Sequence, residues 1–324
     1  MDEYEVIKKI FRPLSFGNNL SLNLDDDVCF LPNRNQIILG TDSIVEGDHF
    51  EKNERNPSLI AKKLLRVNLS DLASKGVSPF GYTLNLSLPK KLNNRNLITW
   101  IKSFARGLKE DQKKYNIKLL GGDTVIINSN LILSLTLFGF KKKKFIKRSD
   151  AIINDDIYVT GNIGESGIGF KIVKKKLKLN KILNTYFLKK YKLPEPPVFF
   201  GNELFKFANS ATDISDGLLA DLNNINLSSK CGAKIFIDNI PFSNKTIKII
   251  KDKKVSIDYL ITCGEDYQII FTSKKKNSKK ILSYAKKKNI KITKIGEVIK
   301  KRKLIVLDNN NKELFFENLG FQHF

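Results

Sequence analysis

The sequence predicts an α+β protein of two α/β domains, the first of them a mixed sheet with flanking helices. Its 324 residues can form two hydrophobic cores, and 41% hydrophobic and 28% charged residues are ordinary for a globular protein. Segments with the period of strands alternate with segments with the period of helices along the chain. Lysines at 141–144 separate two halves, so we expect domains at 1–140 and 145–324.

The first half is expected to alternate strands with helices. Two short apolar runs flank a turn at 33–35 and predict a β-hairpin. Asn56, Pro57 and Gly76 are residue types that begin and end a helix. The expected strands are 28–31, 36–39, 80–88, a strand that ends in Gly121–Thr124, and 131–140; the expected helices are 3–11, one from Pro57 to Gly76, and 94–115.

The second half continues in the same way. A strand at 157–160 leads through a glycine-rich turn into a helix, and two lysine-rich helical segments follow. The stretch LPEPP at 193–197 is a rigid break. The remaining expected elements are a helix to about 208, a helix that opens at Gly217, a strand at 233–237, a further helix, a strand after Asp266, a helix at 277–288, and strands at 292–298 and 304–307.

Several features favour a cytoplasmic protein. No apolar run approaches the ~20 residues that span a bilayer. The N-terminus lacks the basic-then-apolar order of a signal peptide. Cys29, Cys231 and Cys263 are far apart and form no CxxC pair, which favours buried thiols in a reducing compartment. We therefore expect no membrane partner.

The net charge of +24 has two interpretations. A basic surface can bind nucleic acid or attract phosphorylated small molecules. Here the lysine runs at 141–144, 174–176, 274–276 and 286–288 fall in several elements, without interleaved aromatic residues or a recognisable nucleic-acid module. We expect no nucleic-acid partner, and a basic nucleic-acid-binding protein is kept as the alternative from another functional class.

Acidic residues recur where predicted strands and helices end. The apolar run at 37–39 breaks into the polar residues of TDSIVEGDHF, and five similar acids occur elsewhere in the chain. Two bare carboxylates ~4 Å apart repel by ~4 kcal/mol at an effective dielectric near 20, so a converging set needs cations. Oxygen ligands favour Mg²⁺, and phosphoryl transfer from a nucleotide is the natural chemistry. The candidate acids are Asp27, Asp42, Asp71, Asp123, Asp213 and Asp216.

Glycines accompany two of these acids. Gly121 and Gly122 precede Asp123, and glycine lets a ligand approach the backbone closely. Gly217 opens a helix whose N-terminal N–H groups can face an anion. Because Asp213 and Asp216 would repel that anion, we expect metal ions between the carboxylates and the anion.

Eight motifs in this chain, taken together, resemble the thiamine-monophosphate kinase family, within the aminoimidazole-ribonucleotide-synthetase-like ATP-binding superfamily. They occur in the family's order, cover nearly the whole chain, and are specific as an ordered set rather than singly. The motifs are LDDDVCFLP, GTDSIVEGDHF, VNLSDLASKGVSP, LLGGDT, RSDA with DDIYVTGNIGESGIG, ATDISDGLLADL, TCGEDYQIIFT and the terminal GFQHF.

The resemblance implies ATP-dependent phosphorylation of thiamine phosphate to thiamine diphosphate. It implies a magnesium- and ATP-binding N-terminal domain, a C-terminal domain that completes the nucleotide and substrate site, and a homodimer formed through the N-terminal sheet. Catalytic positions are Asp42, Asp123 and Arg148. Metal positions are Asp27, Thr41, Asp42, Asp71, Asp123, Asp213 and Asp216; ATP positions are Gly122, Asp123, Arg148 and Ser215; substrate positions are His49, Glu265 and Phe321.

These roles agree with the chemistry. A phosphate monoester has a second pKa near ~6, so the acceptor is already ionised and needs no general base. Joining two anionic phosphates is a task for metals and Arg148. Glu265 can balance the cationic thiazolium, and Phe321 can pack on the aromatic substrate.

The chain departs from the family pattern at five positions. Gly40 replaces the usual Ser or Thr, which removes one side-chain ligand and leaves a backbone carbonyl. The other departures are Asp25 for Gly, Val125 for a second Thr, Cys263 for Gly, and Phe321 for Tyr or Trp.

Another member of the superfamily is the nearest alternative. An aminoimidazole-ribonucleotide synthetase uses ATP on a different acceptor. A selenophosphate synthetase needs a reactive Cys or selenocysteine in a glycine-rich N-terminal segment, whereas Cys29 lies in an apolar run.

Overall fold

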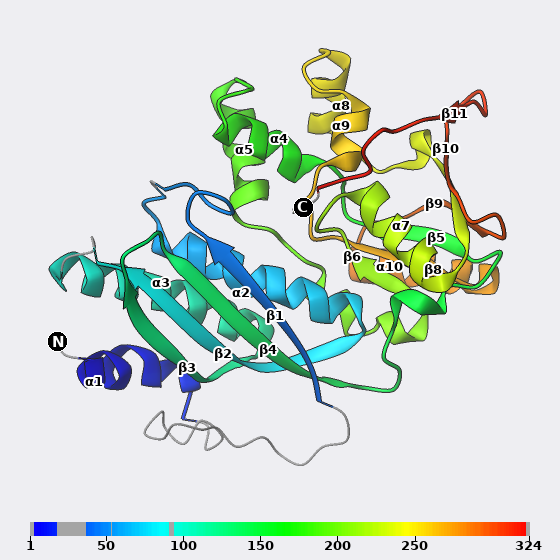
Figure 1. Ribbon diagram of the computed structural model, residues 1–324. Coiled ribbons are helices and arrows are strands. Elements are labelled where there is room, and N and C mark those ends of the chain that lie inside the picture. Colours follow the sequence, from blue (N-terminus) through cyan, green and yellow to red (C-terminus); the bar gives the residue numbers. More distant parts are fainter. Residues whose placement is uncertain (1–2, 18–36, 53, 91–93, 322–324) are drawn as a thin grey trace. The chain divides into compact units, whose positions relative to one another are not determined.

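A computed structural model describes residues 3–17, 37–52, 54–90 and 94–321 (Figure 1). The expected hairpin strand at 28–31, together with Asp25, Asp27 and Cys29, lies outside these residues. The chain forms two compact units. Unit 1 is Met1–Leu72 with Val77–Lys141, and unit 2 is Ala73–Gly76 with Lys142–Phe324.

The expected fold class is confirmed, because each unit combines one sheet with helices. The chain passes into unit 2 after Lys141, and the four residues Ala73–Gly76 also belong to unit 2. Within unit 2, Lys75 Nζ donates a hydrogen bond to the carbonyl of Ala211 at 2.8 Å.

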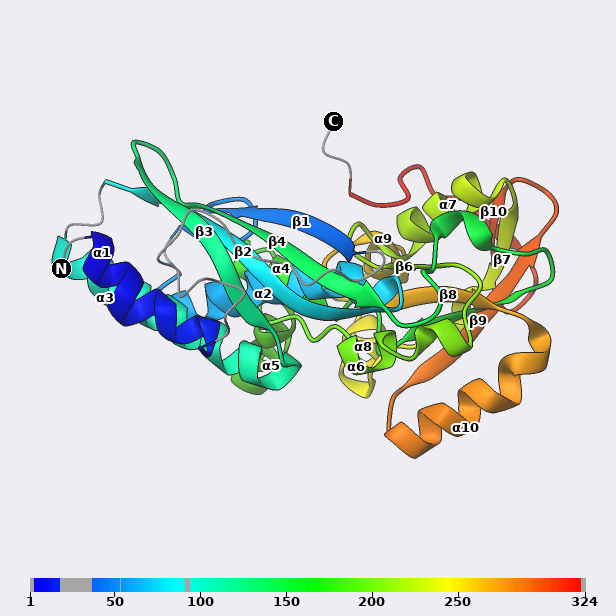
Figure 2. The ribbon, with the colours of Figure 1, turned by 90° about the horizontal axis from the view of Figure 1, so that it is seen from below.

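Unit 1 contains a four-stranded sheet in the order β1-β4-β2-β3 among the described residues. Strand β4 is antiparallel to β1 and β2, whereas β2 and β3 are parallel. Helices α2 and α3 lie on one face of this sheet (Figures 1 and 2). The elements are α1 (Glu3–Val6), a π-helical turn (Ile7–Phe11), a 3₁₀ turn (Arg12–Ser15), β1 (Ile37–Val45), α2 (Pro57–Ser74), β2 (Val77–Pro89), α3 (Asn94–Tyr115), β3 (Lys118–Ile127) and β4 (Ile132–Lys141).

The helix-covered face of the sheet, called the inner face here, contains the core of unit 1. Leu133, Leu135 and Leu137 alternate along β4 and are buried, and so are four leucines of α2, Leu64, Leu65, Leu69 and Leu72. The opposite face, called the outer face, carries Thr41 and Ser43 and a Leu39 side chain that is 61% exposed. Residues two apart on a strand share a face, so the register decides which face each polar side chain occupies.

Two strands extend beyond their expected ends. Strand β1 continues past Leu39 to Val45, and β3 continues past Thr124 to Ile127. In β1, the polar residues Thr41, Asp42 and Ser43, which the sequence suggested would follow the strand, are part of it. The strands are longer than expected because of their pairing with distant strands. Strand β1 pairs with β4 over its whole length, and β3 pairs with β2 to Ile127.

Unit 2 contains a seven-stranded sheet in the order β11-β10-β7-β9-β5-β8-β6. Helices α7 and α10 lie on opposite faces of it (Figures 1 and 2). The strands are β5 (Asp156–Thr160), β6 (Ala211–Asp213), β7 (Gly232–Phe236), β8 (Ile269–Ser273), β9 (Ile292–Ile299), β10 (Leu304–Leu307) and β11 (Glu313–Leu314). The helices are α4 (Glu165–Val173), α5 (Lys181–Lys192), α6 (Val198–Gly201), α7 (Leu218–Ser229), α8 (Asn244–Lys251), α9 (Ile257–Thr262) and α10 (Ser278–Lys288), with 3₁₀ turns at Arg148–Asp150, Leu204–Lys206, Ile237–Asn239 and Lys275–Asn277.

Two hydrophobic clusters support unit 2. The larger packs one side of α7, with Leu218, Leu222 and Ile225, against the sheet. A smaller cluster joins α4, α5, α8 and α9 through Phe187, Leu260 and their neighbours. No helix within the described residues is long and apolar enough to cross a membrane.

Candidate functional site

In unit 1, Asn68 of α2 connects that helix to Asp42 of β1. The backbone N–H of Asp42 donates to Asn68 Oδ1 at 3.0 Å, and Asn68 Nδ2 donates to the carbonyl of Leu64 at 2.9 Å. Asn68 is buried. An amide whose donor and acceptor are both engaged holds one orientation, so Asn68 fixes the position of Asp42 relative to α2.

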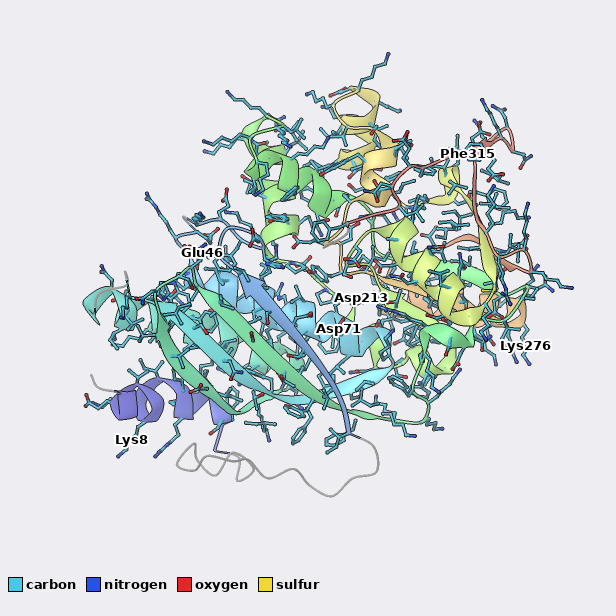
Figure 3. All side chains as sticks on the ribbon, viewed as in Figure 1. Lys8, Glu46, Asp71, Asp213, Lys276 and Phe315 are labelled. Carbon is cyan, nitrogen blue, oxygen red and sulfur yellow. The ribbon has the colours of Figure 1, made fainter. Side chains whose placement is uncertain are left out.

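Asp71 lies one turn further along α2 and faces the same part of β1. A Cβ atom added at Gly40 would be 3.6 Å from Asp71 Oδ2, so this carboxylate lies beside the bare backbone of Gly40. Gly40 and Asp42 are two residues apart in β1 and share the inner face. Figure 3 shows Asp71 on α2. The structure therefore brings Asp42 and Asp71 to one face of the sheet.

The side chain of Thr41 lies on the outer face. Its hydroxyl donates to the carbonyl of Leu135 at 3.1 Å and accepts a hydrogen bond from Thr136 at 3.1 Å. Because neighbouring strand residues face opposite sides of a sheet, this hydroxyl is not with Asp42 and Asp71. A metal ligand from Thr41 would therefore have to be its backbone carbonyl.

Asp123 is also on the outer face, and it lies in the edge strand furthest from β1. It pairs with Asn85, between the inward-facing Leu84 and Leu86 of β2. Three strand spacings of ~4.8 Å separate β3 from β1 by about 14 Å. Within unit 1, the structure does not bring Asp123 together with Asp42 and Asp71.

Gly122 is required by the close approach of two strands. A Cβ atom at this position would be 1.9 Å from the carbonyl oxygen of Leu84. No side chain fits there, so the glycine before Asp123 has a packing role as well as its expected role at the nucleotide. Asp123 Oδ1 accepts the N–H of Thr124 at 2.8 Å.

Hydrogen bonds that involve backbone atoms hold His49 in the turn after β1. Its Nδ1 accepts the N–H of Val45 at 3.2 Å, and its carbonyl accepts a hydrogen bond from Lys63 Nζ at 2.8 Å. A ring whose Nδ1 accepts carries the proton of its neutral form on Nε2.

In unit 2, Arg148 is hydrogen-bonded to β6, the strand that ends at Asp213. Arg148 Nε donates to Thr212 Oγ1 at 3.0 Å, and the hydroxyls of Ser210 and Ser229 donate to the Arg148 carbonyl at 2.8 and 2.7 Å. Asp213 ends β6 and is buried. These contacts fix Arg148 beside Thr212, the residue that precedes the buried Asp213.

Three expected segments meet at Ser215 and Asp216. The N–H of Glu265 donates to the Ser215 carbonyl at 2.8 Å, and the N–H of Phe321 donates to the Asp216 carbonyl at 2.9 Å. A Cβ atom at Gly264 would be 2.2 Å from the Ser215 oxygen, so this approach requires glycine. Phe321 is 59% exposed. The expected nucleotide residue Ser215, the expected metal residue Asp216 and the expected substrate residues Glu265 and Phe321 thus share one region of unit 2.

Two buried aspartates that the sequence analysis did not select support this region. Asp221, in the first turn of α7, accepts backbone N–H groups from the Ser215–Gly217 loop at 3.0–3.3 Å. Burial and the nearby Asp213 raise the pKa of Asp221 to about 7. The signal that could have identified Asp221 is an acidic residue in the first turn of a helix whose N-cap is a glycine.

Asp266 likewise accepts backbone N–H groups, here at the start of α4. It accepts the N–H of Gly164 at 2.6 Å and the N–H and hydroxyl of Ser166, and Ser166 Oγ also contacts the Gly264 carbonyl at 2.7 Å. Burial raises the pKa of Asp266 to about 7. Asp266 therefore links the start of α4 to the segment that carries Glu265.

Cys263, one of the departures, is directed at α4. A Cβ atom at Gly167 would be 2.2 Å from Cys263 Sγ, so the thiol occupies the space beside that glycine. Burial raises the pKa of the Cys263 thiol well above its ordinary value. Cys263 is therefore a packing residue in its thiol form.

The acids fit magnesium that is shared with a substrate. Within the described ranges, no three His, Cys, Asp or Glu side chains are close enough to hold a metal ion by themselves. Magnesium keeps several waters and is usually bound by one or two carboxylates together with substrate phosphates. The pair Asp42 and Asp71, with space at Gly40, and the buried Asp213 beside Asp221 match that pattern.

Comparison with protein families gives two matches in chain order. The model for the N-terminal domain of AIR synthase related proteins matches residues 24–140. The model for the C-terminal domain of these proteins matches residues 153–309.

Thiamine-monophosphate kinases are similar to this chain over its whole length. The kinase of Buchnera aphidicola subsp. Schizaphis graminum is 40% identical over 333 residues, which cover 100% of this chain and 99% of that protein. The kinase of Leptospira interrogans is 33% identical, with 100% and 98% covered. The kinase of Escherichia coli K12 is 34% identical, with 83% and 82% covered.

Solved structures give the same result. Thiamine-monophosphate kinase from Stenotrophomonas maltophilia has a TM-score of 0.82 at 28% identity, covering 94% of this chain and 96% of that one. A structure described as AaThiL complexed with AMPPCP and TMP has a TM-score of 0.77 at 27% identity, covering 89% and 87%. Escherichia coli HypE, at 16% identity and a TM-score of 0.75 over 99% and 98%, shares the fold.

Proposed function

The chain belongs to the thiamine-monophosphate kinase family, and we propose that it transfers the γ-phosphoryl group of ATP to thiamine phosphate, giving thiamine diphosphate and ADP. Relatives similar over the full length, and a similar structure complexed with AMPPCP and TMP, support this reaction. The observation that carries the proposal is the meeting of Ser215, Asp216, Glu265 and Phe321 through backbone hydrogen bonds. That meeting places expected nucleotide and acceptor residues in one region.

The proposed reaction is a direct in-line transfer. An oxygen of the thiamine phosphate attacks the γ-phosphorus, the bond from that phosphorus to the β–γ bridging oxygen breaks, and ADP leaves. The attacking phosphate is ionised near neutral pH, so it needs no general base. Catalysis is then mostly positioning and charge neutralisation.

We assign magnesium to the carboxylates of both units. In unit 1, Asp42 and Asp71 would hold it, with the Thr41 carbonyl and Asp27 as further expected ligands. In unit 2, Asp213 and Asp216 would hold it. Bound magnesium neutralises the charge of the two phosphates.

The remaining roles follow from placement. Arg148 is proposed to contact the transferred phosphoryl group, since its Nε–H is already directed by Thr212. Ser215, Gly122 and Asp123 are assigned to ATP. On the acceptor side, His49 is assigned to thiamine phosphate.

Glu265 and Phe321 are assigned to the thiamine part of the acceptor. Glu265 can balance the positive thiazolium, and the exposed Phe321 ring can lie against its face. Phe321 is joined through its N–H to Asp216, so acceptor and metal residues share one backbone contact.

We also propose a homodimer formed through the outer face of unit 1. Leu39 and Val125 are exposed there, at 61% and 43%, and hydroxyl pairs such as Ser43 with Ser134 lie between them. Exposed apolar side chains on the face of a sheet are typical of an interface. Asp123 lies on this face, so a second copy could complete the site in which Asp123 acts.

The test is turnover by the purified protein with ATP, magnesium and thiamine phosphate, with products separated by chromatography. We expect equal amounts of thiamine diphosphate and ADP. Thiamine and aminoimidazole ribonucleotide precursors serve as alternative acceptors. Turnover on one of these without thiamine diphosphate formation would overturn the acceptor assignment.

A further inference from the structure

Helix α7 begins without a side-chain cap at Gly217, yet the loop before it is tightly held by Asp221. Oδ2 of Asp221 accepts the N–H groups of Ser215, Asp216 and Gly217 at 3.0, 3.0 and 3.3 Å. The N–H of Asp221 itself donates to the Gly217 carbonyl at 3.0 Å, which closes the first turn. One carboxylate oxygen thus gathers three successive amides.

We propose that Asp221 is a positioning residue that sets the conformation of the Ser215–Gly217 loop for nucleotide binding. This inference deepens the proposed kinase function and depends on it for the identity of the ligand. Asp221 is almost fully buried, and its second oxygen, Oδ1, accepts no hydrogen bond within the described residues. It acts on the nucleotide only through the loop.

The contacts of the loop explain why this position matters. The carbonyls of Ser215 and Asp216 are taken by the N–H groups of Glu265 and Phe321. Their N–H groups are taken by Asp221. With both sides of the backbone engaged, the directions of the Ser215 and Asp216 side chains follow from the loop conformation.

The same contacts change how a phosphate can be bound here. The sequence suggested that free N–H groups at this helix start would face an anion. The amides of Ser215, Asp216 and Gly217 instead face Asp221, so they are not available to a phosphate. The loop therefore meets the nucleotide through its side chains, Ser215 directly and Asp216 through a cation.

Because a single oxygen accepts all three N–H groups, the role needs an acceptor and no charge. Asp221→Asn keeps a carbonyl oxygen at that position, whereas Asp221→Ala leaves three amides without a partner. Leu222→Ala is the matched control, since Leu222 is a buried core residue at the next position of the same helix. It lowers stability without removing the acceptor.

The first measurement is amide hydrogen exchange of the wild-type protein, which needs neither a variant nor activity. We expect slow exchange at residues 215–217, and fast exchange there would overturn the proposal. The second is binding of AMPPCP with magnesium by calorimetry. We expect Asp221→Ala to weaken binding about tenfold or more, and Asp221→Asn to stay within about threefold of wild type.

Leu222→Ala should lower the unfolding temperature and leave the affinity unchanged. Equal losses of affinity in Asp221→Asn and Asp221→Ala, or none in Asp221→Ala, would contradict a positioning role. Absence of AMPPCP binding to the wild-type protein would count against the proposed function, and the exchange measurement would still test the loop.

Discussion

The backbone N–H of Asp42 and the side-chain oxygen of Asn68 are 3.0 Å apart, and this hydrogen bond joins β1 to α2 at the acidic residues of unit 1. Asn68 is buried and donates in turn to Leu64. The bond explains how Asp42, on a strand, keeps a defined position relative to Asp71, on a helix. The carboxylate pair therefore depends on an uncharged amide.

Asn68→Ala should reduce both stability and turnover. Loss of the acceptor leaves a backbone N–H unpaired, which costs about 1–3 kcal/mol. We also expect a higher magnesium concentration for half-maximal rate, because Asp42 is no longer fixed beside Asp71. Gln112→Ala is the control, since the buried Gln112 donates to the Leu14 carbonyl in the same unit. If both variants reach half-maximal rate at the same magnesium concentration, the hydrogen bond from Asp42 to Asn68 does not support magnesium binding.

Gly40→Ser should be accepted by the fold and strengthen magnesium binding. The added Cβ would be 3.6 Å from Asp71 Oδ2, an ordinary contact, and the new hydroxyl would lie beside that carboxylate. Replacing glycine within a strand also removes an entropic cost of about 0.5–1 kcal/mol. Unfolding by denaturant and a magnesium titration of the rate measure the two effects.

Gly122→Ser is the comparison for Gly40→Ser, because at Gly122 the structure leaves no space for a side chain. Its Cβ would be 1.9 Å from the Leu84 carbonyl oxygen, so the two strands would have to separate. We expect poor folding from this variant. A Gly40→Ser variant that behaves like Gly122→Ser would show that the space beside Asp71 is not available.

Helix ends could be predicted from the sequence because their signals are local. Asn56 Oδ1 accepts the N–H of Ser58 at the start of α2, and Gly76 follows its end with φ +72°. Helix α3 spans the expected 94–115. These elements depend on residues that are neighbours in the chain.

Strand ends and faces could not be predicted, because they depend on pairing with distant strands. Once β1 extends to Val45, the period of two separates Thr41 from Asp42. The pairing of Asp123 with Asn85 places it on the outer face in the same way. Asp221 was missed because its role is to support the backbone rather than to contact a ligand.

Stability should fall as the pH rises from about 4 to 7, in part because of Asp266. Burial raises the pKa of this carboxyl to about 7 in the folded protein, above its ordinary value of 3.8. The folded state therefore binds the proton more tightly than the unfolded state, and that advantage is lost as pH rises through the folded pKa. The contribution is on the order of 2–4 kcal/mol.

Asp266→Asn should flatten this dependence, because an amide does not titrate in this range. Denaturant unfolding between pH 4.5 and 7.5 measures the slope for each variant. Asp252→Asn, a substitution at an exposed carboxylate of the same unit, is the control and should keep the wild-type slope. If Asp266→Asn keeps the wild-type slope, the raised pKa of Asp266 is not the cause of the pH dependence.

Asp42 and Asp123 should act in different chains of the proposed dimer. They lie on opposite faces of one sheet and near opposite edges, so one copy does not bring them together. Asp42→Asn and Asp123→Asn should each abolish turnover while the fold stays intact. The two variants, co-expressed with different tags and purified as a mixed pair, should regain activity.

The mixed pair has one site with both substitutions and one site with neither, so about half of the wild-type rate per dimer is expected. The control is a mixed pair of Asp42→Asn with Asp71→Asn. These two acids share the inner face of one chain, so every site in that pair contains one substitution and the pair stays inactive. If the pair with Asp123→Asn is equally inactive, Asp123 acts in the same chain as Asp42, and the register argument for a shared site fails. If it is active, the outer face of the sheet is part of the catalytic assembly, because only a second copy can bring Asp123 to an intact Asp42.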